Sequence, residues 1–252
     1  MKRLQLNVLG LSEVRWTGAA SFATGDYTLV YSGGDQHERG VGMLLDEQTS
    51  KSIKGYWAVS DRVLLMKLYG KPFNISIIQA YAPTANYDDD SITDFYEDLD
   101  KAYKQCNSND IVYVMGDFNA KVGNERVGNT VGPFGLGAKN ERGDNLIAWC
   151  QSHNLVITNT WFKNHPRRLW TWKSPGDPMI ELHDLSSDES FDDMKSSDTS
   201  YSSPKTGAAS NKSSSNSTMY DSPRVSDIIL VRAAAYHGIN QLQTFSNIFL
   251  IN

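Results

Sequence analysis

The sequence predicts an α/β protein in which two packed β-sheets are covered by helices. Apolar runs of strand length recur along the chain, and two amphipathic segments of helix length lie among them. The early strands follow one another as hairpins rather than through crossover helices, which disfavours a purely parallel, doubly wound sheet. The length of 252 residues is sufficient for one large domain of this class or for two small ones.

Strands are predicted to dominate the first third of the chain. Residues 1–10 are expected to be the end of a helix that closes at Gly10, and the first strand follows it. The expected strands are residues 11–14, 27–31, 41–45, 63–69 and 73–81. Gly70-Lys71-Pro72 joins the last two as a hairpin, and Pro83 ends the pairing because it has no backbone N–H.

Two helices and the remaining strands are predicted in the following part. Between Ile92 and Ala102, apolar residues recur at three- and four-residue spacing, which predicts a helix over residues 91–105. Ser91 is its expected N-cap. A second helix is expected over residues 142–153. The strands expected here are residues 111–117, 155–159, 168–172 and 225–231.

A polar segment interrupts this pattern. Residues 181–223 consist mainly of Ser, Asp, Lys, Thr and Asn, so they cannot bury enough apolar surface to offset the entropy lost on ordering. We therefore predict a domain over residues 1–177, a disordered Ser/Asp-rich insert over 178–223, and a C-terminal strand and tail of the same domain over 224–252.

Charge and composition narrow the function classes. The polar segment accounts for the whole formal net charge of −5, so the rest of the chain is near neutral and disfavours strong nonspecific nucleic-acid binding through bulk charge. No apolar run approaches the roughly 18 residues that span a bilayer, and the N-terminal apolar part is too short for a signal peptide. Cys106 and Cys150, far apart in the sequence, indicate free thiols. We expect an intracellular monomer, nuclear or cytoplasmic, that is not secreted and binds no membrane.

The segment Gly116-Asp117-Phe118-Asn119 follows a buried-strand pattern that begins at Ile111. Asp117 and Asn119 are two residues apart, so on an extended strand tip their side chains point to the same side. Asp117 is a candidate base, and the amide of Asn119 can orient a phosphate or a water. The plainer interpretation is ordinary turn chemistry after glycine.

Three other segments carry candidate functional residues. Glu13 follows a short apolar run and is either a metal-binding carboxylate or a surface residue. Tyr81 at a strand tip can donate to a phosphate oxygen, or simply pack at the sheet end. Thr171 and Trp172, beside Arg168, can line a substrate groove because aromatic rings stack on bases and sugars, or they belong to a strand covered by a loop.

Taken together, these segments resemble the endonuclease/exonuclease/phosphatase domain in the form carried by RTE-type non-LTR retrotransposons, a group that includes craniofacial development protein 2-like (bucentaur-related) proteins. The resemblance covers about residues 1–177, and the motifs stand in the order typical of the family. The motifs are Leu11-Ser-Glu13-Val-Arg-Trp-Thr-Gly18, Gln79-Ala-Tyr81-Ala-Pro-Thr84, Gly116-Asp117-Phe-Asn119-Ala-Lys-Val-Gly123, Phe134-Gly-Leu-Gly137, Asn140-Glu-Arg-Gly143 and Arg168-Leu-Trp-Thr-Trp172.

The resemblance implies a four-layered α/β sandwich, two mixed β-sheets flanked by helices, and hydrolysis of phosphoesters with Mg²⁺ or Mn²⁺. Glu13 would bind the metal, Asp117 would position or deprotonate the attacking water, and Asn119 and Tyr81 would hold the scissile phosphate. On the DNA side of the groove, the resemblance places Arg168, Thr171 and Trp172.

The sequence also departs from the family pattern. The first family strand, with its metal-binding Asn, is expected to precede the start of this chain, and no Ser-Asp-His motif follows residue 177. Asp227, in the segment Arg224–Val231, is the candidate for a displaced metal-binding Asp. We therefore expect a nuclease-type domain with impaired catalysis, since losing such a histidine pair lowers rates on the order of a thousandfold.

Two alternatives are compatible with the sequence. The first is a non-catalytic interaction protein that keeps the scaffold and binds a protein partner through residues 181–223. The second is a phosphatase that acts on a small phosphoester. The basic and aromatic residues of the Arg168–Trp172 segment favour nucleic acid over the second alternative.

Overall fold

The computed structural model describes residues 1–2, 6–163, 224–225 and 228–232. They belong to one compact unit that joins Met1–Thr171 with Ser222–Asn252. The second unit, Trp172–Asp221, lies outside the described residues. The predicted insert over residues 178–223 therefore stays a prediction.

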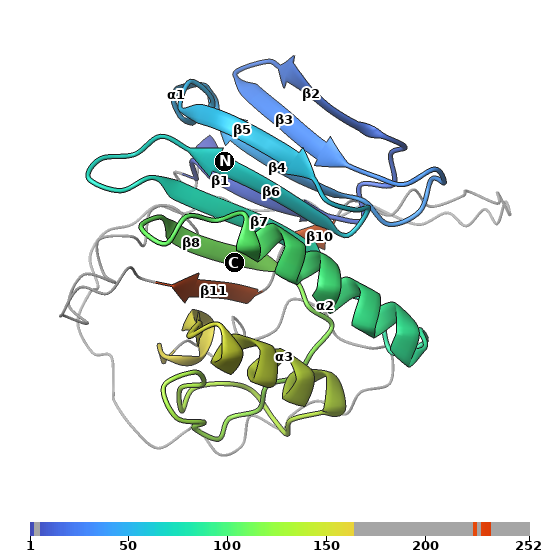
Figure 1. The fold of residues 1–252 in the computed structure, drawn as a ribbon, viewed down its shortest axis with the longest axis vertical. Coiled ribbons are helices and arrows are strands. Elements are labelled where there is room, and N and C mark those ends of the chain that lie inside the picture. Colours follow the sequence, from blue (N-terminus) through green and yellow to red (C-terminus); the bar gives the residue numbers. More distant parts are fainter. Residues whose placement is uncertain (3–5, 164–223, 226–227, 233–252) are drawn as a thin grey trace, which may run out of the picture. The chain divides into compact units, whose positions relative to one another are not determined.

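Two β-sheets form the body of this unit (Figure 1). Sheet A has five strands in the order β10-β1-β4-β3-β2, and all of its pairs are antiparallel. Its strands are β1 (Val8–Ser12), β2 (Ala19–Thr24), β3 (Tyr27–Ser32), β4 (Val41–Asp46) and β10 (Arg224–Val225).

Sheet B has six strands in the order β5-β6-β7-β8-β11-β9 and is mixed, because β7 and β8 run parallel while the other pairs are antiparallel. Its strands are β5 (Ile53–Ala58), β6 (Val63–Leu68), β7 (Ile75–Tyr81), β8 (Ile111–Asp117), β9 (Val156–Ile157) and β11 (Ile228–Arg232). The helices are α1 (Glu47–Ser50), α2 (Asp89–Lys104), α3 (Glu141–Ser152) and the short 3₁₀ helix η2 (Thr158–Thr160).

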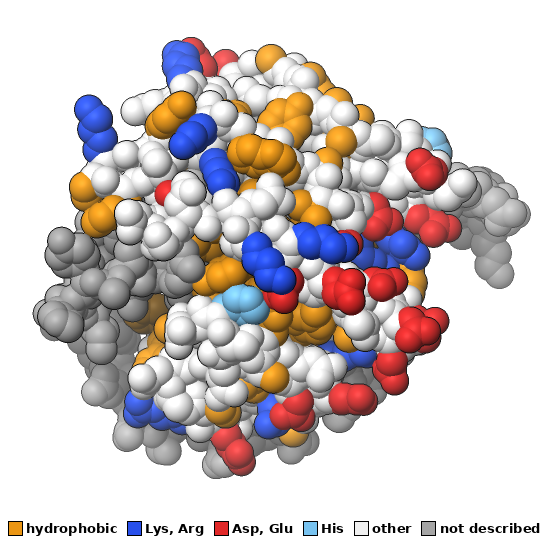
Figure 2. All heavy atoms as spheres, in the orientation of Figure 1, with side chains coloured by type: hydrophobic (Ala, Val, Ile, Leu, Met, Phe, Trp, Pro, Cys, Tyr) orange, Lys and Arg blue, Asp and Glu red, His pale blue; other side chains and the backbone are white. Residues whose placement is uncertain are grey.

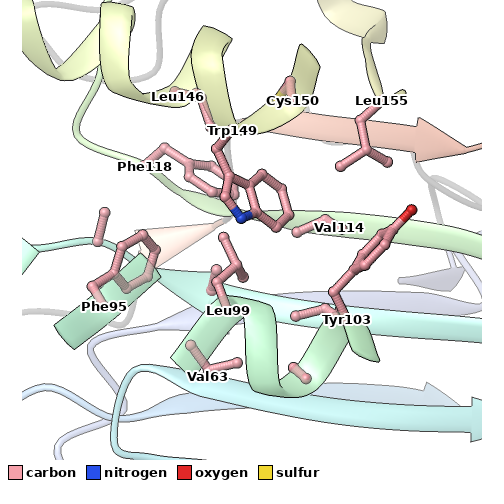
Figure 3. Packing of buried hydrophobic residues seen from close by; sticks show 14 of the residues in the cluster. Val63, Phe95, Leu99, Tyr103, Val114, Phe118, Leu146, Trp149, Cys150 and Leu155 are labelled. Carbon is pink, nitrogen blue, oxygen red and sulfur yellow. The ribbon is translucent and has the colours of Figure 1, made fainter. Parts of the chain in front are cut away.

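The two faces of sheet B pack against different partners. One face packs on sheet A, and the apolar core between the sheets includes Met43, Leu45, Met66 and Ile77. The other face is covered by α2 and α3, whose buried side chains meet it in a second core (Figure 3). Phe95, Leu99, Tyr103, Leu146 and Trp149 belong to this second core. The alternating side chains of β6, β7 and β8 therefore supply apolar residues to both faces.

The predicted α/β sandwich of two packed sheets with helices is confirmed, as are the hairpin β6–β7, strand β8 and helices α2 and α3. The N-cap prediction for α2 was wrong. Asp88 is the N-cap, and its Oδ1 accepts a hydrogen bond from the backbone N–H of Ser91 at 2.9 Å. Sheet A is antiparallel in its described strands, so only sheet B shows the mixed pattern that was expected.

The prediction of a helix that closes at Gly10 was also wrong. The segment Val8–Ser12 is strand β1, which alternates buried and half-buried residues and pairs along its whole length with β4. This apolar run is too short to reveal a helical or a strand repeat in the sequence, and its pairing with β4 determines that it forms a strand. The strand expected over residues 225–231 is two short strands in different sheets, β10 beside β1 and β11 beside β8.

Strands β2 and β5 were not predicted. Both lie at the edges of their sheets and are largely exposed. An edge strand with little burial has no need of an apolar alternation, so its sequence carries no strand period.

The parallel pairing of β7 with β8 depends on one glycine. Gly116 has φ +154°, and a Cβ atom at this position would lie 1.9 Å from the carbonyl oxygen of Ala80. Only glycine allows this approach, and the register then sets Tyr81 opposite Asp117 at the ends of the two strands.

We expect Gly116→Ala to lower the free energy of unfolding by roughly 3–5 kcal/mol, because its methyl group meets fixed backbone on the neighbouring strand. Urea unfolding followed by circular dichroism measures the change. Gly25→Ala is the matched control, since Gly25 also has a positive φ but has no atom within 4 Å of its would-be Cβ; about 1–2 kcal/mol is expected there. Equal losses in the two variants would contradict the steric explanation.

Candidate functional site

Three strand ends bring the predicted site residues together. Strand β1 of sheet A ends directly before Glu13, while β7 and β8 of sheet B end at Tyr81 and Asp117. Tyr81 and Asp117 are register partners, and the backbone N–H of Ala82 donates to the carbonyl oxygen of Asp117 at 2.8 Å. Sheet packing then sets Glu13 against Tyr81.

Glu13 links the two sheets. The Tyr81 hydroxyl donates to its Oε1 at 2.9 Å, and Arg15 Nη2 lies 3.0 Å from its Oε2. Glu13 is 9% exposed and has φ +58°, an uncommon conformation for a residue with a side chain. Strained backbone of this kind recurs at functional sites. A buried carboxylate needs such partners, because an unpaired charge is costly to bury.

Tyr81 is held as a neutral hydrogen-bond donor. Burial, then the hydrogen bond and charge of Glu13, and then the charge of Asp117 all raise the pKa of Tyr81 far above its ordinary value. The side chain therefore keeps its phenolic proton throughout the physiological pH range. The Tyr81 side chain thus lies between two carboxylates, since it is bonded to Glu13 and is the register partner of Asp117.

Asp117 and Asn119 are joined by a tight turn. Asp117 is 7% exposed, and its Oδ1 accepts from the backbone N–H of Asn119 at 3.0 Å. Asn119 has φ +47°, and its Nδ2 donates to the carbonyl oxygen of Ala82 at 2.8 Å. One amide hydrogen of Asn119 is thus used to hold the loop after β7, and the second remains available by its chemistry.

Two polar residues that support the site were missed by the sequence reasoning. Gln79 is fully buried and donates through Nε2 to the Leu11 carbonyl at 3.2 Å and to Ser12 Oγ at 3.3 Å, which ties β7 to β1 next to Glu13. Arg62 donates through Nη1 to the Tyr81 carbonyl at 3.1 Å. A glutamine in a largely apolar strand was the available signal for Gln79, since such residues are buried only with partners.

The remaining predicted residues could not be placed. Asp227, Arg168, Thr171 and Trp172 lie outside the described residues. Of the histidines, the structure describes His37, whose Nδ1 lies 3.1 Å from the Arg15 carbonyl oxygen, and His153, whose Nε2 lies 3.3 Å from Asp100 Oδ1 on α2.

The donor set at the strand ends fits a hard divalent cation. Mg²⁺ commonly binds through one or two carboxylates together with waters and substrate phosphates, and Glu13 and Asp117 offer two carboxylates around Tyr81. A carboxylate oxygen has a second lone pair beyond the bond it already accepts. Within the described residues, no group of three or more His, Cys, Asp or Glu side chains could hold a metal by itself.

Comparison with known proteins decides the family. The sequence model of the Endonuclease/Exonuclease/phosphatase family matches residues 1–234. The chain belongs to this family. It is also the family from whose resemblance the roles of Glu13, Tyr81 and Asp117 were predicted.

Two proteins named Craniofacial development protein 2 are similar to this family member. The one from Bos taurus is 39% identical over 176 residues, which are 69% of this chain and 30% of the relative. The one from Tragulus javanicus is 38% identical over 176 residues, which are 69% of this chain and 31% of the relative. The match thus spans less than a third of the length of either relative.

Two solved structures align with part of this chain. The endonuclease domain of TRAS1, a telomere-specific non-LTR retrotransposon, has 13% identity and a TM-score of 0.38, with 60% of this chain and 58% of the other covered. An endonuclease/exonuclease/phosphatase family protein from Leptotrichia buccalis has 14% identity and a TM-score of 0.33, with 55% of this chain and 50% of the other covered.

Within the described residues, no helix has both the length and the apolar character needed to cross a bilayer.

We expect Tyr81→Phe to lower the free energy of unfolding by roughly 1.5–3 kcal/mol, because the buried Glu13 carboxylate loses its phenolic donor. Tyr96→Phe is the control, since Tyr96 is partly buried and its hydroxyl has no hydrogen bond within the described part of the chain. Chemical denaturation of both variants measures the difference. Losses of equal size would show that the Tyr81–Glu13 bond contributes no stability.

Proposed function

We propose that the site formed by Glu13, Tyr81, Asp117 and Asn119 hydrolyses phosphodiester bonds with Mg²⁺, and that DNA is the substrate. The observation that supports this most directly is the Tyr81 hydroxyl, which is bonded to Glu13 and lies in the field of Asp117. Two acidic groups and a neutral donor at neighbouring strand ends are the groups that metal-assisted phosphoryl chemistry requires.

Each residue has a role consistent with its surroundings. Glu13 would hold the metal together with Asp227, which lies outside the described residues. Bound Mg²⁺ would stabilise the negative charge that develops on the phosphoryl oxygens and the leaving group. Asp117 would orient the attacking water and accept its proton. Tyr81 and the second N–H of Asn119 would donate to the phosphate, and Tyr81 would turn its hydroxyl from Glu13 to a phosphate oxygen.

The charge on the molecular surface favours binding at the strand ends over binding on the helices. Helix α2 carries six acidic residues and two lysines, and its exposed acids gather on the face shown in Figure 2. A cavity of about 400 Å³ between α2 and α3 is lined by Glu97 and Asp100 as its charged residues. Such a surface repels a nucleic acid, whereas Arg15 and Arg62 are bonded to Glu13 and Tyr81 at the strand ends.

The proposal includes the origin of the domain, which the sequence suggests is a retroelement. The predicted impairment follows from the absence of the Ser-Asp-His motif of the family. The residues predicted to line the DNA side of the groove are Arg168, Thr171 and Trp172. These three groove residues lie outside the described residues. A turnover measurement on the purified chain tests the impairment directly.

We expect the purified chain to nick supercoiled or abasic DNA slowly in the presence of Mg²⁺, as the predicted impairment requires, and EDTA to abolish this activity. Glu13→Gln and Asp117→Asn should each lower the rate by about a hundredfold or more, because each removes a charge that acts on the reacting groups. Asp98→Asn on helix α2, where Asp98 pairs with Lys101, is the matched control and should leave the rate unchanged. Absence of Mg²⁺-dependent cleavage in the wild type, or equal rates in all variants, would refute the proposal.

A further inference from the structure

Two arginines and a tyrosine form a cluster beside the candidate site. Arg62 precedes strand β6, Arg39 lies in the loop before β4, and Tyr87 lies in the loop before α2. The Arg62 guanidinium carbon is 4.9 Å from the centre of the Tyr87 ring, and that of Arg39 is 5.3 Å from the same ring. Asp61 is the carboxylate of the cluster and lies 3.1 Å from Arg39 Nη1.

This cluster is bonded directly to the residues of the site. Arg62 donates to the Tyr81 carbonyl, and its guanidinium carbon lies 5.3 Å from the centre of the Tyr81 ring. The carbonyl oxygen of Arg39 accepts from the backbone N–H of Arg15 at 2.8 Å, two residues after Glu13. The arginine cluster and the carboxylate site therefore share one end of the sandwich.

Both guanidinium groups carry unused hydrogen-bond donors. Arg62 is 7% exposed, and its Nη2 is buried without a hydrogen-bond partner among the described residues. The Nε of Arg39 is likewise buried and unpartnered there. A charged donor that is buried unsatisfied loses its bonds to water and gains none in return, so such groups in a native structure call for an explanation.

The cluster also has an excess of positive charge, with two guanidinium groups and one carboxylate. Burial, and then the charge of Arg39, lower the pKa of Arg62, while Asp61 opposes this effect. Arginine stays charged in proteins, so the excess charge favours an anion. Stacking on the tyrosine rings and the ion pair with Asp61 explain how the two arginines are held, but they do not explain the unused donors.

We propose that Arg39 and Arg62 form a subsite for a second phosphate of the substrate, next to the phosphate that reacts at Glu13, Tyr81 and Asp117. Guanidinium groups match phosphate geometry and bind it through paired N–H donors. This inference rests on the proposed function and deepens it: a site with a place for a neighbouring phosphate is suited to a polynucleotide backbone, whereas a small phosphomonoester has no group to put there.

The subsite can be tested by binding alone. The full chain would be titrated in EDTA, which prevents Mg²⁺-dependent cleavage, with a short fluorescein-labelled DNA duplex at several salt concentrations. Arg39→Met is the informative variant, because the Arg39 side chain is 35% exposed and its loss should not unfold the protein. Lys104→Met is the control variant. It removes one positive charge at the last residue of α2, which is distant in sequence from the site. Urea unfolding of each variant confirms its stability.

We expect Arg39→Met to weaken DNA binding by about tenfold and to reduce the slope of log K against log salt by about one, as for the loss of one phosphate contact. Arg39→Lys should restore the slope but only part of the affinity, and Lys104→Met should match the wild type. Equal affinity and slope in Arg39→Met and Lys104→Met would overturn the subsite, as would a wild type that binds no DNA at low salt. An Arg39-dependent slope in a chain without cleavage would uphold the subsite and refute the proposed activity.

Discussion

The close approach of β7 and β8 at Gly116 is the constraint on which the candidate site depends. It allows parallel pairing to continue to the strand ends, where Tyr81 and Asp117 become neighbours. The apolar core between the sheets then fixes β1 opposite β7, so that Glu13 meets the Tyr81 hydroxyl. A shift of one residue in the β7–β8 register would turn Tyr81 to the other face of the sheet.

The site concentrates groups that are individually unfavourable to bury. Glu13 and Asp117 are nearly inaccessible carboxylates, and Gln79 and Arg62 are buried polar side chains around them. Hydrogen bonds from Tyr81, Arg15 and the turn at Asn119 offset part of this cost. Positive φ angles at Glu13, Arg15 and Asn119 add local strain. A fold that keeps such an arrangement at the strand ends of two sheets is better explained by chemistry than by packing.

Sequence reasoning succeeded where a period or a motif was long enough to be distinctive. The hairpin β6–β7, strand β8 and helices α2 and α3 follow from apolar spacing alone, and the order of the motifs along the chain indicates the family. The edge strands β2 and β5 escaped because exposed strands carry no alternation. Gln79 and Arg62 escaped for a different reason, since a buried polar residue is defined by partners that are distant in sequence.

The central claim is that Glu13, Tyr81 and Asp117 form one site for a divalent metal, and paramagnetic relaxation by Mn²⁺ tests it most directly. Amide signals of the isotope-labelled protein would be followed by NMR as Mn²⁺ is added in small amounts. Broadening should begin at residues 12–14, 81–82 and 116–119, the three strand ends that the fold brings together. Broadening that begins on the acidic face of α2 and leaves these strand ends unaffected would contradict the account.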